Sequence, residues 1–273
     1  GLSGLGLKER PRTIPGKQAA AAVGQIVLMA LYERAFSAGD VRVAQILLTH
    51  DDLANRRRYL NAKHTMLTLL DARVTPIVNE NDTVAVEEMQ FGDNNHLSSL
   101  VAVLVEADLL VILSDIEGLY DKDPRVHADA QLIAVVEQLT DALFANAGSA
   151  GTLGRGGMVS KLQAAQKAGL SGIPTIIADG RQDETLDAVF DPVSDVGTLF
   201  LPVADRLTSR KHWIAYTLKP AGELVVDAGA SSAIRDRGRS LLPPGVRTVT
   251  GTFSEGECVT CLDETGQPFA RGL

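Results

Sequence analysis

The feature that most constrains the fold is an alternation of short apolar runs with helical patterns between residues 17 and 200. The run LLVIL (109–113) is continuously apolar, as expected for a strand buried on both faces of a sheet. Similar runs occur at 41–49, 74–78 and 173–178. Strands separated by helices imply βαβ units, so the pattern predicts an α/β fold: a three-layer αβα sandwich with a mainly parallel sheet.

Helical spacing and helix-ending glycines predict the intervening helices at residues 17–40, 53–71, 96–107 and 158–169. After about residue 205 the pattern changes to short strand-like runs, including WIAYTL (213–218), with a short helix at 231–242. We therefore predict two domains, an α/β domain at 1–207 and a small, mainly β domain at 208–273.

Charge and composition exclude several classes of protein. The net charge of −8, with eight Lys/Arg against seven Asp/Glu after residue 208, makes nucleic acid an unlikely partner. No uninterrupted apolar run reaches the roughly 18 residues of a membrane helix, and the polar opening lacks the pattern of a signal peptide. Cys258 and Cys261 cannot form a disulfide framework and lack further zinc ligands nearby. We expect ordinary strand cysteines in a cytoplasmic protein without a membrane partner.

Polar residues follow each predicted strand of the first domain. They are Thr49-His50-Asp51, Asn79-Glu80-Asn81-Asp82, Ser114-Asp115 and Asp179-Gly180. Ligands of open α/β sheets bind beyond the carboxyl ends of the strands, so these residues predict a binding site. Asp82 and Asp115 could instead be turn formers or helix caps.

The stretch GRGGMVSKLQAAQKAG (154–169) places Lys161 in the first turn of a helix. A cation there is disfavoured by roughly 0.3–1 kcal/mol, because the helix N-terminus carries partial positive charge. An anion held by the glycine amides, the helix end and the ammonium group would reverse that preference. The alternative is a solvated lysine after a flexible loop. The spacing is not that of a Walker A loop.

The rest of the sequence favours phosphoryl transfer. It has no serine nucleophile elbow, no informative histidine–carboxylate pair and no metal-binding cluster. A glycine loop, a lysine and strand-end carboxylates suit a reaction that depends on positioning and charge neutralisation. Mg²⁺ is expected to arrive with ATP.

Four motifs, in order, resemble those of the glutamate 5-kinase family, a branch of the amino acid kinases. They are VNENDTVA (78–85), FGDNN (91–95), LLVILSDIEGLYDKDPR (109–125) and GRGGMVSKLQAA (154–165). The C-terminal module resembles a PUA domain, and the likeness covers almost the whole chain. It implies ATP-dependent phosphorylation of the side-chain carboxylate of L-glutamate, the first step of proline biosynthesis.

The resemblance also implies roles for particular residues. Lys161 and Asn95 match catalytic positions, and Asp82, Asp93 and Asn94 match glutamate-binding positions. The nucleotide-binding positions are Ser114, Asp115, Gly154, Arg155, Gly156, Gly157, Met158 and Lys161. Feedback inhibition by proline and assembly into a homo-oligomer, a dimer or tetramer, are further expectations.

Three departures from the family pattern leave alternatives open. Asn95 stands where the family commonly has Asp, and Arg155 where it usually has a small polar residue. The family's opening strand, with its glycine-rich turn and a catalytic lysine, has no counterpart here. If the protein lacks it, transfer should be severely impaired. The alternatives are another carboxylate or carbamate kinase of this fold, a non-catalytic homologue, and an RNA-binding accessory protein.

Overall fold

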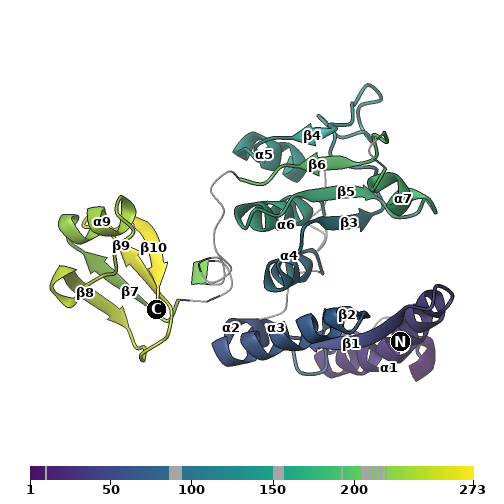
Figure 1. Ribbon diagram of the computed structural model, residues 1–273, viewed down its shortest axis with the longest axis horizontal. Helices are drawn as coiled ribbons and strands as arrows, with labels where there is room; N and C mark the ends of the chain where they lie inside the picture. The colour runs from purple at the N-terminus through teal and green to yellow at the C-terminus, as the bar shows by residue number, and fades with distance from the viewer. Residues whose placement is uncertain are drawn as a thin grey trace. The chain divides into compact units, whose positions relative to one another are not determined.

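Two compact units make up the computed structural model, Gly1–Arg206 and Leu207–Leu273 (Figure 1). The structure describes residues 1–9, 11–85, 94–149, 157–191, 193–203, 211, 214–215, 218 and 220–273. Helices alternate with mainly parallel strands in the first unit, and the second is rich in β-structure, which confirms the predicted fold class. The predicted boundary between residues 207 and 208 falls outside the described residues and stays a prediction.

In the first unit, β1 (Arg42–Leu48) and β2 (Val74–Glu80) form a parallel pair. Their register runs from Arg42 opposite Val74 to Leu48 opposite Glu80, so both carboxyl ends finish side by side. Helix α3 (Arg56–Asp71) makes the crossover between them. The polar residues after the two strands are therefore brought to one edge.

A second sheet has the strand order β3-β5-β6-β4. Strand β3 (Leu110–Ser114) runs parallel to β5 (Thr175–Asp179), with Ser114 opposite Asp179. The remaining strands are β6 (Thr198–Phe200), antiparallel to β5, and β4 (Val135–Val136). The sequence did not predict β4 and β6, because strands this short leave no periodic pattern to detect.

Helices α4 (Asn94–Val105) and α6 (Met158–Leu170) pack against each other and against β3 (Figure 1). Ala164, Ala165 and Ala168 of α6 belong to a buried core with Ala102 and Val103 of α4. Small side chains at such a contact allow two helices to approach closely. Helices α5 (Asp141–Ser149) and α7 (Thr185–Val189) complete the second half of this unit.

The predicted helix at 53–71 is wrong in its first turns. The structure has α2 (His50–Ala54), then Asn55 in an extended conformation, then α3. The Asn55 side chain accepts hydrogen bonds from the backbone N–H groups of Arg57 and Arg58, which starts a new helix. Thr49, predicted as a strand residue, caps α2 in a capping box with Asp52.

The first helix, α1 (Ile14–Ser37), is long and apolar enough to cross a membrane, by length and composition only. Polar residues nevertheless join it to other parts of the first unit. Gln18 Nε2 donates to the Ala85 carbonyl oxygen at 3.3 Å, and Gln25 Oε1 accepts from Asn79 Nδ2 at 2.9 Å. These two hydrogen bonds fix α1 beside the β1–β2 pair. A short 3₁₀ turn, η1 (Ser3–Leu5), contacts this helix.

The second unit contains a sheet of order β10-β9-β7-β8. Its elements are β7 (Gly222–Val226), α9 (Ala228–Arg235), η4 (Pro243–Gly245), β8 (Val246–Gly251), β9 (Val259–Leu262) and β10 (Pro268–Gly272). Helix α9 overlaps the predicted helix at 231–242 but begins earlier, at Ala228, and ends earlier, at Arg235. Cys258 and Cys261 are buried and free, and burial raises the pKa of both thiols. Half of the predicted strand at 213–218 lies outside the described residues, and the prediction is wrong at Ile214 and Ala215, which are helical.

A substitution of Gly197, which lies just before β6 in the first unit, tests the packing of β6 against β5. Its φ is +80°, and a Cβ there would lie 2.5 Å from the Ile177 carbonyl oxygen of β5. Gly6 in the same unit has a φ of +66° and open space around the missing Cβ. An L-residue in a left-handed conformation costs about 1–2 kcal/mol, so Gly6→Ala should lose no more than that. Gly197→Ala should lose more in urea unfolding, because it adds a clash with backbone. Equal losses would contradict the described approach of β6 to β5.

Candidate functional site

The N-terminus of α6 presents backbone N–H groups without a side-chain cap. Its N-cap residue, Gly157, is extended, with φ −67° and ψ −178°, and makes no side-chain capping bond. The first N–H groups of any helix lack partners within the helix, and those of Met158 and Val159 are in this position. An anion is the natural ligand for such a helix end.

Lys161 lies in the first turn of this helix and is only 7 % exposed. The interpretation of this residue as a solvated lysine is therefore wrong. Burying an ammonium group is costly unless acceptors or anions surround it. Lys161 therefore places positive charge beside a helix N-terminus that has no side-chain cap, an arrangement that favours an anion nearby.

Two side-chain contacts join the start of α4 to α6. Asn95 Nδ2 donates to Ser160 Oγ at 3.0 Å, and Ser160 Oγ donates to the Gly157 carbonyl oxygen at 2.9 Å. His96 Nδ1 and Lys167 Nζ make the second contact. Asn95 and Lys161, the two proposed catalytic residues, are thereby placed on neighbouring first turns. Asn94, the first residue of α4, is exposed.

The carboxyl ends of β3 and β5 form a second part of the site. The Gly180 N–H donates to the Ser114 carbonyl oxygen at 2.8 Å, and Ser114 Oγ donates to Asp115 Oδ1 at 3.2 Å. Asp115 is exposed beyond the strand end. Ser114 is therefore the last residue of β3 and Asp115 follows it, at the strand end where the sequence predicted them.

Arg181 is a charged residue of this edge that sequence reasoning missed. Its Nε and Nη2 atoms both donate to the Asp179 carboxylate at 2.8 Å. These bonds lower the pKa of Asp179 to about 2. The hydrogen bonds to Asp179 and the charge of Asp179, and less strongly the charges of Asp115 and Glu117, raise the pKa of Arg181. The signal in the sequence was its position, directly after the strand-end pair Asp179-Gly180.

The carboxyl ends of β1 and β2 form the third part. They border a cavity of about 270 Å³ whose lining consists of Thr49, His50, Asp51, Asp52, Arg58, Asn81, Val84 and Ala85. The Asn81 N–H donates to the Leu48 carbonyl oxygen at 2.9 Å, which holds the two strand ends together. Asp82 follows directly and is half-buried, and burial raises the pKa of its carboxyl group.

Helix α4 connects these parts, because it packs against β2, β3 and α6. The structure thus brings Asn95 to the N-terminus of α6, and sets Asp82 and Ser114 at the ends of the two strands that α4 contacts. Asp93, Gly154, Arg155 and Gly156, also predicted from the sequence, lie outside the described residues. Within the described part of the chain, no three His, Cys, Asp or Glu side chains gather as a metal site.

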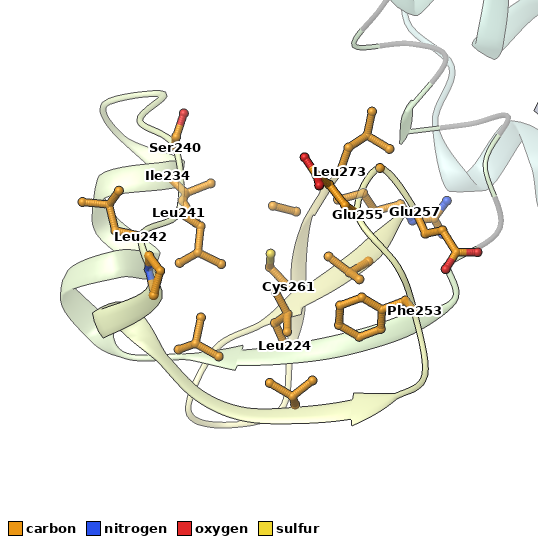
Figure 2. A pocket seen from close by; sticks show the side chains of 18 of the residues that line it. Leu224, Ile234, Ser240, Leu241, Leu242, Phe253, Glu255, Glu257, Cys261 and Leu273 are labelled. Atoms are coloured by element: carbon orange, nitrogen blue, oxygen red, sulfur yellow. The ribbon is translucent and has the colours of Figure 1, made fainter. Parts of the chain in front are cut away.

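A larger hollow, of about 800 Å³, belongs to the second unit and contains none of the predicted kinase residues. Leu224 and Cys261 form its floor, Leu241 and Leu242 one side, and Phe253 the other (Figure 2). Its lining is largely apolar, with Arg239 and Arg271 among the few charged residues.

Comparison with known proteins agrees with this geometry. The amino acid kinase family profile matches residues 2–179, and the PUA domain profile matches residues 222–273. The chain therefore belongs to the amino acid kinase family and carries a C-terminal PUA domain.

The relatives narrow the class further. The chain is 55 % identical to a protein of Citrifermentans bemidjiense named glutamate 5-kinase, over 100 % of this chain and 73 % of that protein. It is 52 % identical to the glutamate 5-kinase of Meiothermus ruber, over 100 % of this chain and 72 % of that protein. A solved isopentenyl phosphate kinase is 14 % identical, with a TM-score of 0.47 over 67 % of this chain and 70 % of that one.

Asp82 and Asp179 should affect stability in opposite directions. Because the folded pKa of Asp82 is raised, its contribution to stability is lost as pH rises from the unfolded value of 3.8 through the folded pKa. Asp82→Asn should therefore raise the free energy of unfolding at pH 7, with a difference that disappears below pH 3.8.

The pKa of Asp179 is lowered, so its contribution is present above 3.8 and lost as pH falls toward about 2. Asp179→Asn should lower the free energy of unfolding at pH 7. Urea titrations from pH 3 to pH 7 measure both changes. Destabilisation by both substitutions at pH 7 would contradict the described burial of Asp82.

Proposed function

We propose that this chain carries the ATP-dependent phosphorylation of the side-chain carboxylate of L-glutamate, which yields L-glutamyl 5-phosphate. The observation that carries the proposal is the buried Lys161 beside the uncapped N-terminus of α6, with Asn95 hydrogen-bonded to the same turn. The name shared by the relatives supports glutamate as the acceptor and the first step of proline biosynthesis as the role.

The reaction needs no general base from the protein. The acceptor carboxyl group has an unperturbed pKa of about 4.3, so it is already an anionic nucleophile at neutral pH. One of its oxygens forms a bond to the γ-phosphorus of ATP as the bond from that phosphorus to the β–γ bridging oxygen breaks. The electron pair of the broken bond leaves with ADP. No proton has to move.

The barrier is therefore the approach of one anion to another, and oriented positive charge has to lower it. Lys161 would neutralise charge on the transferring phosphoryl group, and the N–H groups of Met158 and Val159 would donate to phosphate oxygens. Gly157 allows close approach because it has no Cβ. Gly154, Arg155 and Gly156, which precede the helix, are proposed nucleotide contacts from the resemblance. Asn95 would orient the ammonium group of Lys161.

The remaining residues would bind the two substrates. Ser114 and Asp115 at the end of β3 are proposed to contact the nucleotide, and Arg181 adds a cation at that edge. Asp82 and Asp93 would grip the ammonium group of glutamate, with Asn94 beside them. The raised pKa of Asp82 agrees with this role, since a substrate cation would stabilise its charged form.

Mg²⁺ is proposed to enter with ATP. Such ions take one or two protein carboxylates and complete their coordination with phosphate oxygens and water. The exposed carboxylate of Asp115 fits this donor set and would hold the ion at the end of β3. When bound, the ion would supply charge neutralisation at the phosphates.

The cellular location, the regulation and the oligomeric state of the enzyme are predictions from the resemblance. We place it in the cytoplasm, and expect proline to inhibit it and the protein to form a homo-oligomer, a dimer or tetramer. The nearly balanced charge of the PUA domain gives no electrostatic reason to add nucleic acid as a partner.

Trapping of the acyl phosphate by hydroxylamine tests the function. Protein expressed from the complete coding sequence should form glutamyl hydroxamate with ATP, Mg²⁺ and L-glutamate. Lys161→Met should lower kcat by about 100-fold or more, because it removes charge that stabilises the transition state. Lys8→Met, at an exposed lysine of the same unit, should retain activity within several-fold. Hydroxamate formed from aspartate but not from glutamate would assign a different carboxylate kinase, and full activity of Lys161→Met would reject the proposed site.

A further inference from the structure

We propose that Ser160 is a positioning residue that selects one of the two orientations of the Asn95 side-chain amide. This inference rests on the proposed kinase function for its consequence, although the contact itself can be tested without activity. It assigns a specific task to a residue that the resemblance left without a role.

The donor pattern around Ser160 is directional. Ser160 Oγ donates its proton to the Gly157 carbonyl oxygen at 2.9 Å and accepts a hydrogen bond from Asn95 Nδ2 at 3.0 Å. A hydroxyl group has one proton and two acceptor lone pairs. Because that proton is used for Gly157, the face of Ser160 toward Asn95 can only accept. It therefore favours the NH₂ end of the amide.

The opposite orientation of the amide is disfavoured. Half a turn about the terminal torsion exchanges Oδ1 with Nδ2 and would set the amide oxygen against Ser160 Oγ. To relieve that contact, the hydroxyl group would have to give up its bond to Gly157. The loss of one hydrogen bond shifts such an equilibrium by about 2- to 12-fold. The preference is modest, but it acts on the atom that Asn95 presents to the site.

The choice matters because an amide has two different ends. A carboxylate at position 95 would offer two equivalent oxygens in either orientation. Asn95 offers an acceptor to the rest of the site only if Nδ2 is turned toward Ser160. An acceptor is what an ammonium group requires, and the next residue of α6 is the buried Lys161. Ser160 thus keeps the amide oxygen of Asn95 turned toward the rest of the site. A carboxylate at the same position would present an oxygen in either orientation.

Measurement of kcat for Ser160 variants, with Asn or with Asp at position 95, tests this role. Ser160→Ala should lower kcat by up to about twofold, because a 2- to 12-fold preference gives way to two equally populated orientations, while the KM values for ATP and glutamate stay unchanged. Ser160→Thr, which retains the hydroxyl group, should restore kcat. In the Asn95→Asp background, Ser160→Ala should leave kcat unchanged within experimental error, because a carboxylate has no orientation to select. An equal loss in both backgrounds, or no loss with Asn95, would overturn the proposal.

A second measurement needs no catalysis. Urea unfolding of the wild type, Ser160→Ala, Asn95→Ala and the double variant gives the coupling between the two side chains. Non-additive losses are expected, and additive losses would overturn the proposed contact. If the wild type forms no glutamyl hydroxamate, the proposed function fails, while this cycle still decides whether Ser160 holds Asn95.

Discussion

The close packing of α4 on α6 is the contact on which the rest of the site depends. Ala164, Ala165 and Ala168 of α6 share a buried core with Ala102 and Val103 of α4, and small side chains in such a core favour a close approach of the two helices. That approach brings Asn95 within hydrogen-bonding distance of Ser160 and places Lys161 in a buried first turn. A larger residue on this alanine surface would separate the two helix starts, and with them the charged and polar groups of the site.

Parallel strand pairing supplies the second half of the geometry. Leu48 lies opposite Glu80 and Ser114 opposite Asp179, so each pair of strands delivers its polar ending at the same level. Strand register and helix packing thus act together. The strands place polar residues at their carboxyl ends, and the start of α6 places N–H groups beside the Lys161 cation, an arrangement that the proposed phosphoryl transfer would use.

Much of this could be predicted from the sequence, because the elements concerned have strong local patterns. Continuous apolar runs predicted β3 and β5, and the polar residues after them predicted the edge where Ser114 lies. The misses have physical causes. Asn55 is extended and so ends α2, and its side chain then caps the start of α3; β4 and β6 are too short to show a period. The Asn95–Ser160 bond joins residues 65 positions apart, so it depends on helix packing that no local pattern encodes.

The central claim is that the start of α6 and Lys161 hold the transferring phosphoryl group. A crystal structure with ADP, Mg²⁺, aluminium fluoride and L-glutamate would test it most directly, since the fluoride complex mimics a phosphoryl group in transfer. The account predicts that this group lies within hydrogen-bonding distance of Lys161 Nζ and the first N–H groups of α6, with the glutamate side chain in line. A nucleotide whose phosphates lie away from α6 would contradict it.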